Sequence, residues 1–241
     1  MVDNTSRDKE SQMPVALITG ASLGLGRALA TELAGRGWFL VVDGRRAELL
    51  EDMAAKLAPG LVTALPGDVA DPAHRASLFA AVTRHGRLDL LVNNASRLGP
   101  SPQPPLRDYP LEELAAVYEV DVLAPLALVQ LHYELLTAGA GTIVNISSDA
   151  GAEPYEGWGG YGSAKAALDH LSAILAVEEP ALDVYAFDPG DMRTEMHQQA
   201  YPDEDISDLP DPESVVPALL ALLDRRPASG RYRAQDLVQR L

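Results

Sequence analysis

The sequence predicts an α/β domain built as a doubly wound parallel sheet with helices on both faces. Short apolar runs alternate with amphipathic segments, no internal repeat is present, and a glycine-rich turn follows the first apolar run. Ligands of such sheets bind at the carboxyl ends of the strands. We therefore expect the functional residues to come directly after the apolar runs.

The apolar runs and amphipathic segments give the expected elements in chain order. Strands are expected at residues 15–19, 38–43, 61–65, 88–92, 142–146, 183–187 and 230–234. Helices are expected after the glycine-rich turn, at residues 45–57, 71–85, 111–136 and 213–223, and in the segment that carries Tyr161 and Lys165.

Two proline signals and one aperiodic stretch refine this assignment. Asp71 followed by Pro72 is typical of a helix start, an N-cap with proline at the first helical position. Pro125 is expected to bend or divide the long helix. Residues 192–212 are acidic and show no periodicity, so residues 191–212 are expected to form a substrate loop or lid.

Composition and charge limit the possible partners. The formal net charge of −16 argues against binding to nucleic acid or an anionic membrane, and the absence of cysteine excludes disulfides. Residues 1–12 are expected to be a disordered polar tail, and residues 13–241 a single domain. No apolar run approaches the roughly 20 residues of a membrane span. These observations predict a soluble, cytoplasmic protein.

The stretch from Gly141 to Leu168 carries the most specific chemistry. Tyr161 and Lys165 are four residues apart and would share one face of a helix. A lysine beside a phenol is expected to lower the phenol's pKa, which prepares it for acid/base work. Ser147 or Ser148, after the preceding strand, could bind a carbonyl oxygen. The alternative is a surface tyrosine and lysine on an ordinary helix.

A glycine-rich turn follows the first strand. Gly20, Gly24 and Gly26 stand between an apolar run and a helix, which is the context of a dinucleotide-binding turn. Glycine lets backbone N–H groups approach a pyrophosphate at the helix N-terminus. Further polar or glycine residues follow the other strands, at 43–46, 68, 93–96, 148 and 189–194.

Over residues 14–235 these motifs resemble the short-chain dehydrogenase/reductase family. The matching segments are Thr19-Gly20-x-x-x-Gly24-x-Gly26, Asp68-Val69, Asn93-Asn94-Ala95, Ser148, Tyr161-x-x-x-Lys165, and Pro189-Gly190 with Thr194. Ser148 is preferred over Ser147 because it precedes Tyr161 by 13 residues, the family spacing. The resemblance implies a Rossmann-type sandwich with about seven parallel strands and an NAD(P)-dependent oxidoreductase acting on a carbonyl/alcohol pair.

The resemblance also implies the role of each site residue. Tyr161 would move a proton to or from the substrate oxygen, Lys165 would lower its pKa and bind the nicotinamide ribose, and Ser148 would orient the carbonyl. The positions expected to bind the cofactor are Gly20, Ser22, Leu23, Gly24, Leu25, Gly26, Gly44, Arg45, Arg46, Asp68, Val69, Asn94, Ala95, Ser96, Tyr161, Lys165, Pro189, Gly190, Met192 and Thr194.

Asp121 departs from the family pattern. The family usually has an asparagine here that completes the active site through a water, whereas this chain has an aspartate. Ionised, it would place a negative charge near Lys165 and offset that lysine's effect on Tyr161. We expect an active enzyme with an altered pH profile and count Asp121 among the catalytic residues. The alternatives are a helix residue without a catalytic part, or a catalytically weak dinucleotide-binding sensor or scaffold.

The end of the second strand bears on the choice between NAD and NADP. A carboxylate there binds both ribose hydroxyls and repels a 2′-phosphate, whereas arginine attracts that phosphate. The small Gly44 falls where the family's NAD-selecting acid would stand, and Arg45 and Arg46 follow, so NADP(H) is favoured over NAD(H). Against this, Asp43 is one position away, and Leu23 stands where many NADP enzymes carry a base.

The remaining expectations concern the substrate and assembly. Tyr155, Trp158 and Met196 are expected to line an apolar, partly aromatic pocket for an uncharged small-molecule carbonyl or alcohol, or else to pack the loop. The five histidines show no metal-ligand spacing, so no metal is expected. The resemblance implies a homodimer or homotetramer, formed through the apolar segments 123–136 and 166–175.

Overall fold

The computed structural model describes residues 13–238 and contains one seven-stranded sheet, in the order β3-β2-β1-β4-β5-β6-β7. Every neighbouring pair of strands is parallel. The expected doubly wound parallel sheet is confirmed, while the expected polar tail lies outside the described residues. The strands are β1 (Val15–Ile18), β2 (Phe39–Gly44), β3 (Val62–Pro66), β4 (Leu90–Asn93), β5 (Thr142–Ile146), β6 (Asp183–Asp188) and β7 (Gly230–Arg233).

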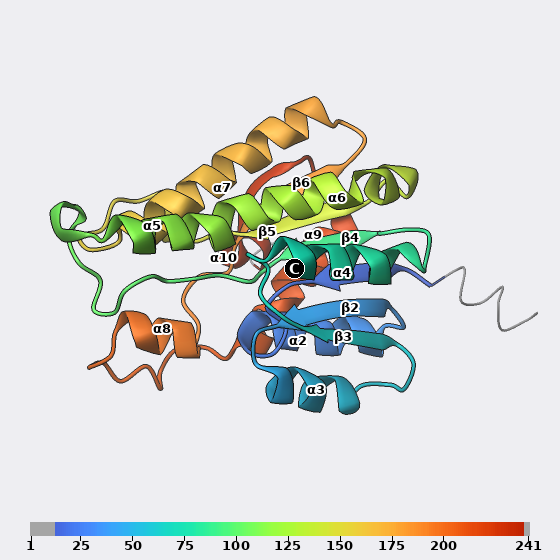
Figure 1. Cartoon of the computed structure of the whole chain (residues 1–241), viewed down its shortest axis with the longest axis horizontal. Coiled ribbons are helices and arrows are strands. Elements are labelled where there is room, and N and C mark those ends of the chain that lie inside the picture. The colour runs from blue at the N-terminus through green and yellow to red at the C-terminus, as the bar shows by residue number, and fades with distance from the viewer. Residues whose placement is uncertain (1–12, 239–241) are drawn as a thin grey trace, which may run out of the picture.

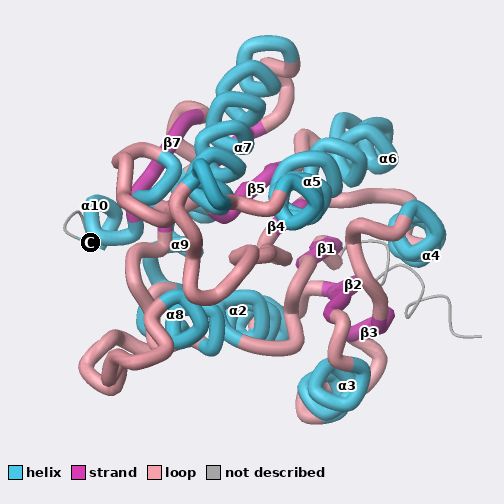
Figure 2. Tube along the Cα trace, turned by 60° about the vertical axis from the view of Figure 1, so that its left-hand side comes forward, coloured by secondary structure: helices cyan, strands magenta, loops and turns pink. Residues whose placement is uncertain are grey.

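Helices cover both faces of this sheet (Figures 1 and 2). On β1, Ala16 and Ile18 point into one core with α2 and α9, and Val15 and Leu17 point into the other with α4 and α6. The strands have buried side chains on both faces of the sheet, which explains why they read as continuous apolar runs. The helices are α2 (Gly24–Gly35), α3 (Ala47–Ala55), α4 (Pro72–Thr83), α5 (Leu111–Tyr118), α6 (Ala124–Ala138), α7 (Gly159–Glu178), α8 (Glu195–Ala200), α9 (Val216–Arg225) and α10 (Ala234–Val238).

The long helical segment is divided just before Pro125, as its sequence predicts. A π-helical turn, Glu119–Leu123, joins α5 to α6, and Pro125 occupies the first turn of α6. Proline has no N–H to donate to the carbonyl four residues back, so the regular ladder cannot run through this point. The irregular turn carries the side chain of Asp121 toward the carboxyl edge of the sheet.

The same segment corrects the expectation about membrane spans. By length and composition alone, Leu111–Ala138 is long and apolar enough to cross a membrane, with a mean hydropathy of 1.6 in its most apolar window. Its apolarity has a use in the fold, because Leu128, Val129 and Leu136 of α6 belong to the core between the helices and the sheet. The expected cytoplasmic location and lack of membrane binding stay predictions.

Other sequence-based boundaries are confirmed or corrected locally. Asp71 caps α4 by accepting a hydrogen bond from the N–H of Ala73, as expected. The stretch 192–212 is not loop throughout, because it contains α8, whose N-cap Thr194 accepts a hydrogen bond from the N–H of His197. Six residues are too short for a periodic signal. The helix expected at 213–223 is α9, which begins at Val216, and a further helix, α10, follows β7.

The strand order fixes where a ligand can enter. From β1 the chain winds outward to β2 and β3, then crosses back to continue with β4 on the other side of β1. Loops therefore leave the carboxyl ends of β1 and β4 in opposite directions, and a crevice opens between them.

Candidate active site

A cavity of about 920 Å³ occupies this crevice at the carboxyl edge of the sheet. It runs from the end of β2 past the glycine-rich turn to α7 and α8. Of the predicted site residues, the structure brings the following to its wall: Gly20, Ser22, Leu23, Gly24, Leu25, Gly44, Arg45, Arg46, Asp68, Val69, Asn94, Ala95, Ser96, Ser148, Tyr155, Trp158, Tyr161, Lys165, Pro189, Gly190, Met192, Thr194 and Met196. Gly26 and Asp121 are not part of the wall.

Asn94 holds the glycine-rich turn in place. Its side-chain amide donates hydrogen bonds to the carbonyl oxygens of Thr19 (2.9 Å) and Gly20 (3.1 Å). The Thr19 hydroxyl oxygen accepts from the N–H groups of Asn94 and Ala95, both at 3.0 Å. A Cβ on Gly26 would lie 2.5 Å from the Asn94 amide nitrogen, so this glycine allows the helix to approach β4. Asn94 therefore shapes the turn as well as lining the cavity.

Asp43, at the end of β2, lines the cavity and is also held by other parts of the protein. Its buried carboxylate accepts hydrogen bonds from the N–H of Gly20 (2.7 Å) and is 3.1 Å from Nε2 of His74. Burial raises the pKa of Asp43, and these two contacts oppose the shift. Sequence reasoning did not single out His74, since it lies 31 positions after Asp43, beyond α3 and β3.

The two arginines that follow are exposed at the mouth of the cavity. Arg46 forms an ion pair with Glu195 of α8 at 2.7 Å. Arg45 has no ion-pair partner among residues 13–238 and lines the cavity directly beside Gly44. A cationic side chain is thus available where the second strand ends.

Tyr161 and Lys165 meet on the buried face of α7, as their spacing predicts. Tyr161 is 9% exposed and Lys165 only 2% exposed. The Lys165 ammonium lies 5.3 Å from the centre of the Tyr161 ring and donates a hydrogen bond to the carbonyl oxygen of Ile146 at 2.9 Å. The alternative of a surface tyrosine and lysine is wrong, because both side chains turn inward to the cavity.

Ser148 stands opposite this pair at the end of β5. Its hydroxyl donates to Asp149 Oδ1 (3.0 Å) and accepts from the N–H of Ala150 (3.2 Å). It is also one of two hydroxyls, with Ser96, that interact with the Tyr161 phenol. Ser147 is buried and its hydroxyl reaches only the Ser148 carbonyl, at 3.5 Å.

Burial dominates the electrostatics of Tyr161. It raises the pKa of the phenol above its ordinary value, and the Lys165 ammonium and the hydroxyls of Ser96 and Ser148 only oppose this shift. The expected net lowering of the Tyr161 pKa by Lys165 is therefore wrong for the free chain. A phenol with a raised pKa stays protonated at neutral pH, which is the form that donates a proton.

Asp121 has two protein partners that sequence reasoning missed. Its fully buried carboxylate accepts hydrogen bonds from the Ser96 hydroxyl (3.1 Å) and from the N–H of Arg97 (2.8 Å). Burial raises the pKa of Asp121, and the charge of Lys165 and these hydrogen bonds oppose the shift. The Ser96 hydroxyl also opposes the rise in the pKa of Tyr161, so it bears on both acidic groups.

Aromatic side chains form the outer end of the cavity. The Trp158 ring contacts Tyr161 edge to face at 5.8 Å and Tyr201 at 5.9 Å between ring centres. Met196 packs on the apolar cluster that contains Tyr161. The Tyr155 hydroxyl donates to Asp149 Oδ2 at 3.0 Å. Tyr201 escaped notice because it lies in the aperiodic stretch after α8.

No metal site accompanies these groups. Residues 13–238 contain no group of three or more His, Cys, Asp or Glu side chains that could hold a metal ion.

Comparison with known proteins agrees with this geometry. Residues 14–205 match the family model described as short chain dehydrogenase. The chain is 36% identical to sepiapterin reductase of Rattus norvegicus over 201 residues, 77% of each protein. It is 30% identical to the (S)-benzoin-forming benzil reductase of Saccharomyces cerevisiae over 215 residues, 86% of this chain and 80% of that one.

A solved structure is similar over nearly the whole chain. A short chain dehydrogenase from Shigella flexneri, complexed with NADP, gives a TM-score of 0.85 at 29% identity and covers 92% of this chain and 97% of its own. The predicted family and Rossmann-type sheet are confirmed. The protein belongs to the short-chain dehydrogenase family and is an NAD(P)-dependent oxidoreductase of CH–OH and C=O groups.

Proposed function

We propose that this protein is an NADPH-dependent carbonyl reductase in which Tyr161 donates the proton to the substrate oxygen. The observation that carries the proposal is the meeting of Tyr161, Lys165 and Ser148 in the wall of the same cavity as the glycine-rich turn. Of these three, Tyr161 and Lys165 are almost completely buried. Burying an ammonium group costs folding free energy, so a buried lysine beside a buried tyrosine in a cavity is typical of a functional site.

The residues present fit an extended dinucleotide. Gly20 and Gly24 take positive φ angles of 65° and 55°, which leaves backbone rather than side chains at the centre of the cavity. Thr194 and the Pro189-Gly190 turn would hold the nicotinamide end, and Asp68 and Val69 the adenine end. The bound nicotinamide supplies the hydride.

The protein's own groups then act on the substrate oxygen. The hydroxyls of Ser148 and Tyr161 would bind and orient the carbonyl, and the Tyr161 phenol would give its proton to the developing alkoxide. The Lys165 ammonium would stabilise the phenolate that remains. Because burial raises the pKa of Tyr161, the phenol is protonated at neutral pH and ready for reduction. Trp158 and Met196 would exclude water.

The choice of NADP(H) rests on the two charged positions at the end of β2. The Asp43 carboxylate lines the cavity, but it accepts from the N–H of Gly20 and lies beside His74, so fewer of its lone pairs are left for the ribose hydroxyls. Arg45 is exposed at the cavity mouth beside Gly44. The relative from Shigella flexneri was solved with NADP, which supports the same choice.

Initial rates with NADPH and NADH test the cofactor. We expect a preference for NADPH, and an Arg45→Ala variant should raise the KM for NADPH at least about tenfold, the value of a charge-assisted contact of roughly 1.5 kcal/mol. The KM for NADH should stay within about twofold. Arg84→Ala, at the C-cap of α4 and outside the cavity wall, is the matched control. A wild-type preference for NADH would refute the proposal.

The aromatic outer end of the cavity indicates the substrate class. Trp158 and Tyr201 offer ring faces and edges to a planar group next to the carbonyl. The relative from Saccharomyces cerevisiae is a benzil reductase, so benzil and other aryl ketones are the first probes. We expect NADPH oxidation with such ketones, and Tyr161→Phe should lower kcat by about 10²–10⁴. Tight NADPH binding without turnover on any ketone or aldehyde would instead favour the sensor or scaffold, which the relatives do not support.

Assembly through α6 and α7 is part of the proposal. Leu123 and Leu131 on the long helix, and Ile174 and Val177 on α7, expose 39–82% of their surface. These apolar side chains support a homodimer or homotetramer through these helices. Light scattering measures the mass; a monomer at micromolar concentration would contradict this.

A further inference from the structure

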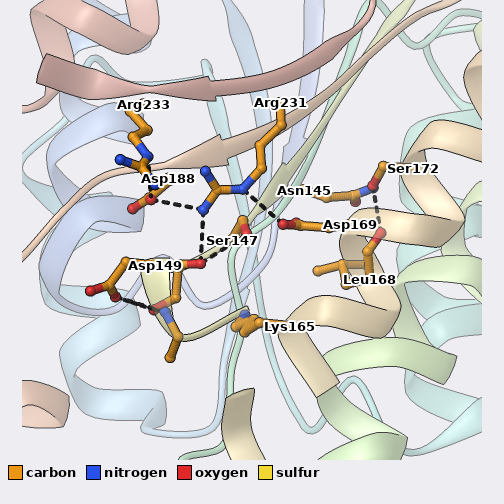
Figure 3. A network of polar contacts seen from close by, with 12 residues as sticks. Asn145, Ser147, Asp149, Lys165, Leu168, Asp169, Ser172, Asp188, Arg231 and Arg233 are labelled. Carbon is orange, nitrogen blue, oxygen red and sulfur yellow. Dashed lines mark hydrogen bonds and ion pairs between the residues drawn. The ribbon is translucent and has the colours of Figure 1, made fainter. Parts of the chain in front are cut away.

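Arg231 makes three contacts from β7, a strand that no prediction connected with the site. Its Nε donates to Asp169 Oδ2 at 2.9 Å, and one terminal nitrogen, Nη2, donates to Asp188 Oδ2 at 2.8 Å and to the carbonyl oxygen of Ser148 at 2.9 Å. Figure 3 shows the Arg231 guanidinium between the carboxylates of Asp188 and Asp169. The side chain is 26% exposed, so most of it is surrounded by protein.

Each acceptor lies on a segment that carries a proposed site residue. Ser148 presents its carbonyl to Arg231 and its hydroxyl to the cavity. Asp188 ends β6, and its other carboxylate oxygen accepts from the N–H of Gly190 at 3.0 Å, which shapes the Pro189-Gly190 turn. Asp169 stands on α7, one turn after Lys165. One guanidinium thus joins the ends of β5 and β6 to the helix of Tyr161.

We propose that Arg231 is a positioning residue that fixes Ser148 and the Pro189-Gly190 turn relative to the Tyr161 and Lys165 helix. The role given to Ser148 and Tyr161 rests on the proposed function; the mechanical link does not. A planar guanidinium presents its donors in a fixed fork, so three acceptors bound together lose their relative freedom. Catalysis is sensitive to such freedom, since a misplacement of about 1 Å can cost about 10² in rate.

Charge strengthens the link. The side chains of Asp188 and Asp169 are 4% and 16% exposed, and Arg231 is the cation closest to both. Arg233 contributes only a longer contact to Asp188, at 3.8 Å. Removing the guanidinium would leave two poorly hydrated carboxylates without their main partner, and these would move toward solvent.

Arg226 provides a matched control. It too pairs with a carboxylate, that of Asp183, and donates to a carbonyl oxygen, that of Ala140 at 2.7 Å. Asp183 begins β6 and Ala140 precedes β5, so Arg226 joins the same two strands at the end remote from the cavity. Its loss should cost stability without moving Ser148.

The test compares Arg231→Lys with Arg226→Lys by hydrogen exchange of the free protein and by kinetics. Lysine keeps the charge and loses the fork, so both variants should fold. We expect Arg231→Lys to speed amide exchange at least tenfold in residues 148–152 and 189–194, and Arg226→Lys to leave these segments within twofold of wild type. With NADPH and an aryl ketone, Arg231→Lys should lower kcat at least tenfold with a KM for NADPH within threefold, and Arg226→Lys should leave kcat within twofold.

The two readouts separate the possible failures. Unchanged exchange at 148–152 and 189–194 in Arg231→Lys overturns the positioning role whatever the activity. Faster exchange with an unchanged kcat overturns its bearing on catalysis. Wild-type protein that binds NADPH but reduces no carbonyl refutes the proposed function, while the exchange comparison still decides the mechanical link.

Discussion

Replacing Gly26 by alanine tests the close approach on which the dinucleotide turn depends. An alanine Cβ would lie 2.5 Å from the Asn94 amide nitrogen and 2.6 Å from the carbonyl oxygen of Gly20. Comfortable contact is about 3.5 Å, so these atoms must separate by about 1 Å. The atoms in the way are the turn's own backbone and the amide that holds it, and neither can rotate away freely.

The cost follows from what must move. Overpacking of this kind costs about 1–3 kcal/mol, and the two hydrogen bonds of Asn94 to Thr19 and Gly20 are worth about 1 kcal/mol each. The better helix propensity of alanine returns about 1 kcal/mol. We therefore expect Gly26→Ala to lower the free energy of unfolding by about 2–4 kcal/mol. Displacement of the turn should also weaken NADPH binding at least tenfold.

Gly35→Ala is the matched control, at the other end of the same helix, α2. A Cβ there meets nothing within 4 Å. We expect its stability to stay within about 1 kcal/mol of wild type and its NADPH affinity to be unchanged. Urea unfolding gives the free energies, and quenching of tryptophan fluorescence gives the Kd. If Gly26→Ala unfolded and bound NADPH like Gly35→Ala, the close approach would not be what shapes the turn.

Three further predictions concern titratable groups. Because burial raises the pKa of Tyr161 and reduction needs the protonated phenol, kcat for reduction should be flat through neutral pH and fall only as pH rises above about 10; a fall centred near pH 7 would contradict this. Asp121→Asn removes a charge that raises the Tyr161 pKa, so the alkaline limb should move to lower pH, and an unchanged profile and rate would remove Asp121 from the mechanism. Burial lowers the pKa of His132, so the unfolded chain binds the proton more readily and stability should be lost as pH falls below about 6.5; His132→Phe should flatten unfolding free energy against pH in that range, and an equal slope in both proteins would refute this.

Local sequence signals predicted the parts of the site that are close in sequence. The apolar run 142–146 became β5 with the same bounds, and Asp71 capped α4. Four-residue spacing placed Tyr161 and Lys165 on one face of α7. In each case the cause lies within a few residues, where periodicity and capping chemistry act.

Contacts that depend on strand order could not be read from the chain. The pairing of Asp43 with His74 requires the end of β2 and the first turn of α4 to lie side by side. The Arg231 contacts require β7 to join the sheet beside β6 and α7 to pack close by, across 83 residues in the case of Ser148. Nothing in the local sequence of either residue specifies its partner, because the partner is set by the order of the strands.

The position of Asp121 depends on both a local feature of the helix and contacts with residues distant in sequence. The π-helical turn ahead of Pro125 brings the Asp121 carboxylate to the Ser96 hydroxyl and to the N–H of Arg97. The carboxylate accepts a direct hydrogen bond from each of these donors. Lys165 then interacts with two acidic groups, Asp121 and Tyr161, and opposes the rise that burial causes in the pKa of each. A lysine that is shared in this way stabilises the Tyr161 phenolate less than one that serves the tyrosine alone. A phenol that holds its proton more firmly disfavours the base needed for alcohol oxidation, whereas the acid needed for carbonyl reduction stays populated. In the proposed mechanism, the aspartate would therefore favour carbonyl reduction at neutral pH.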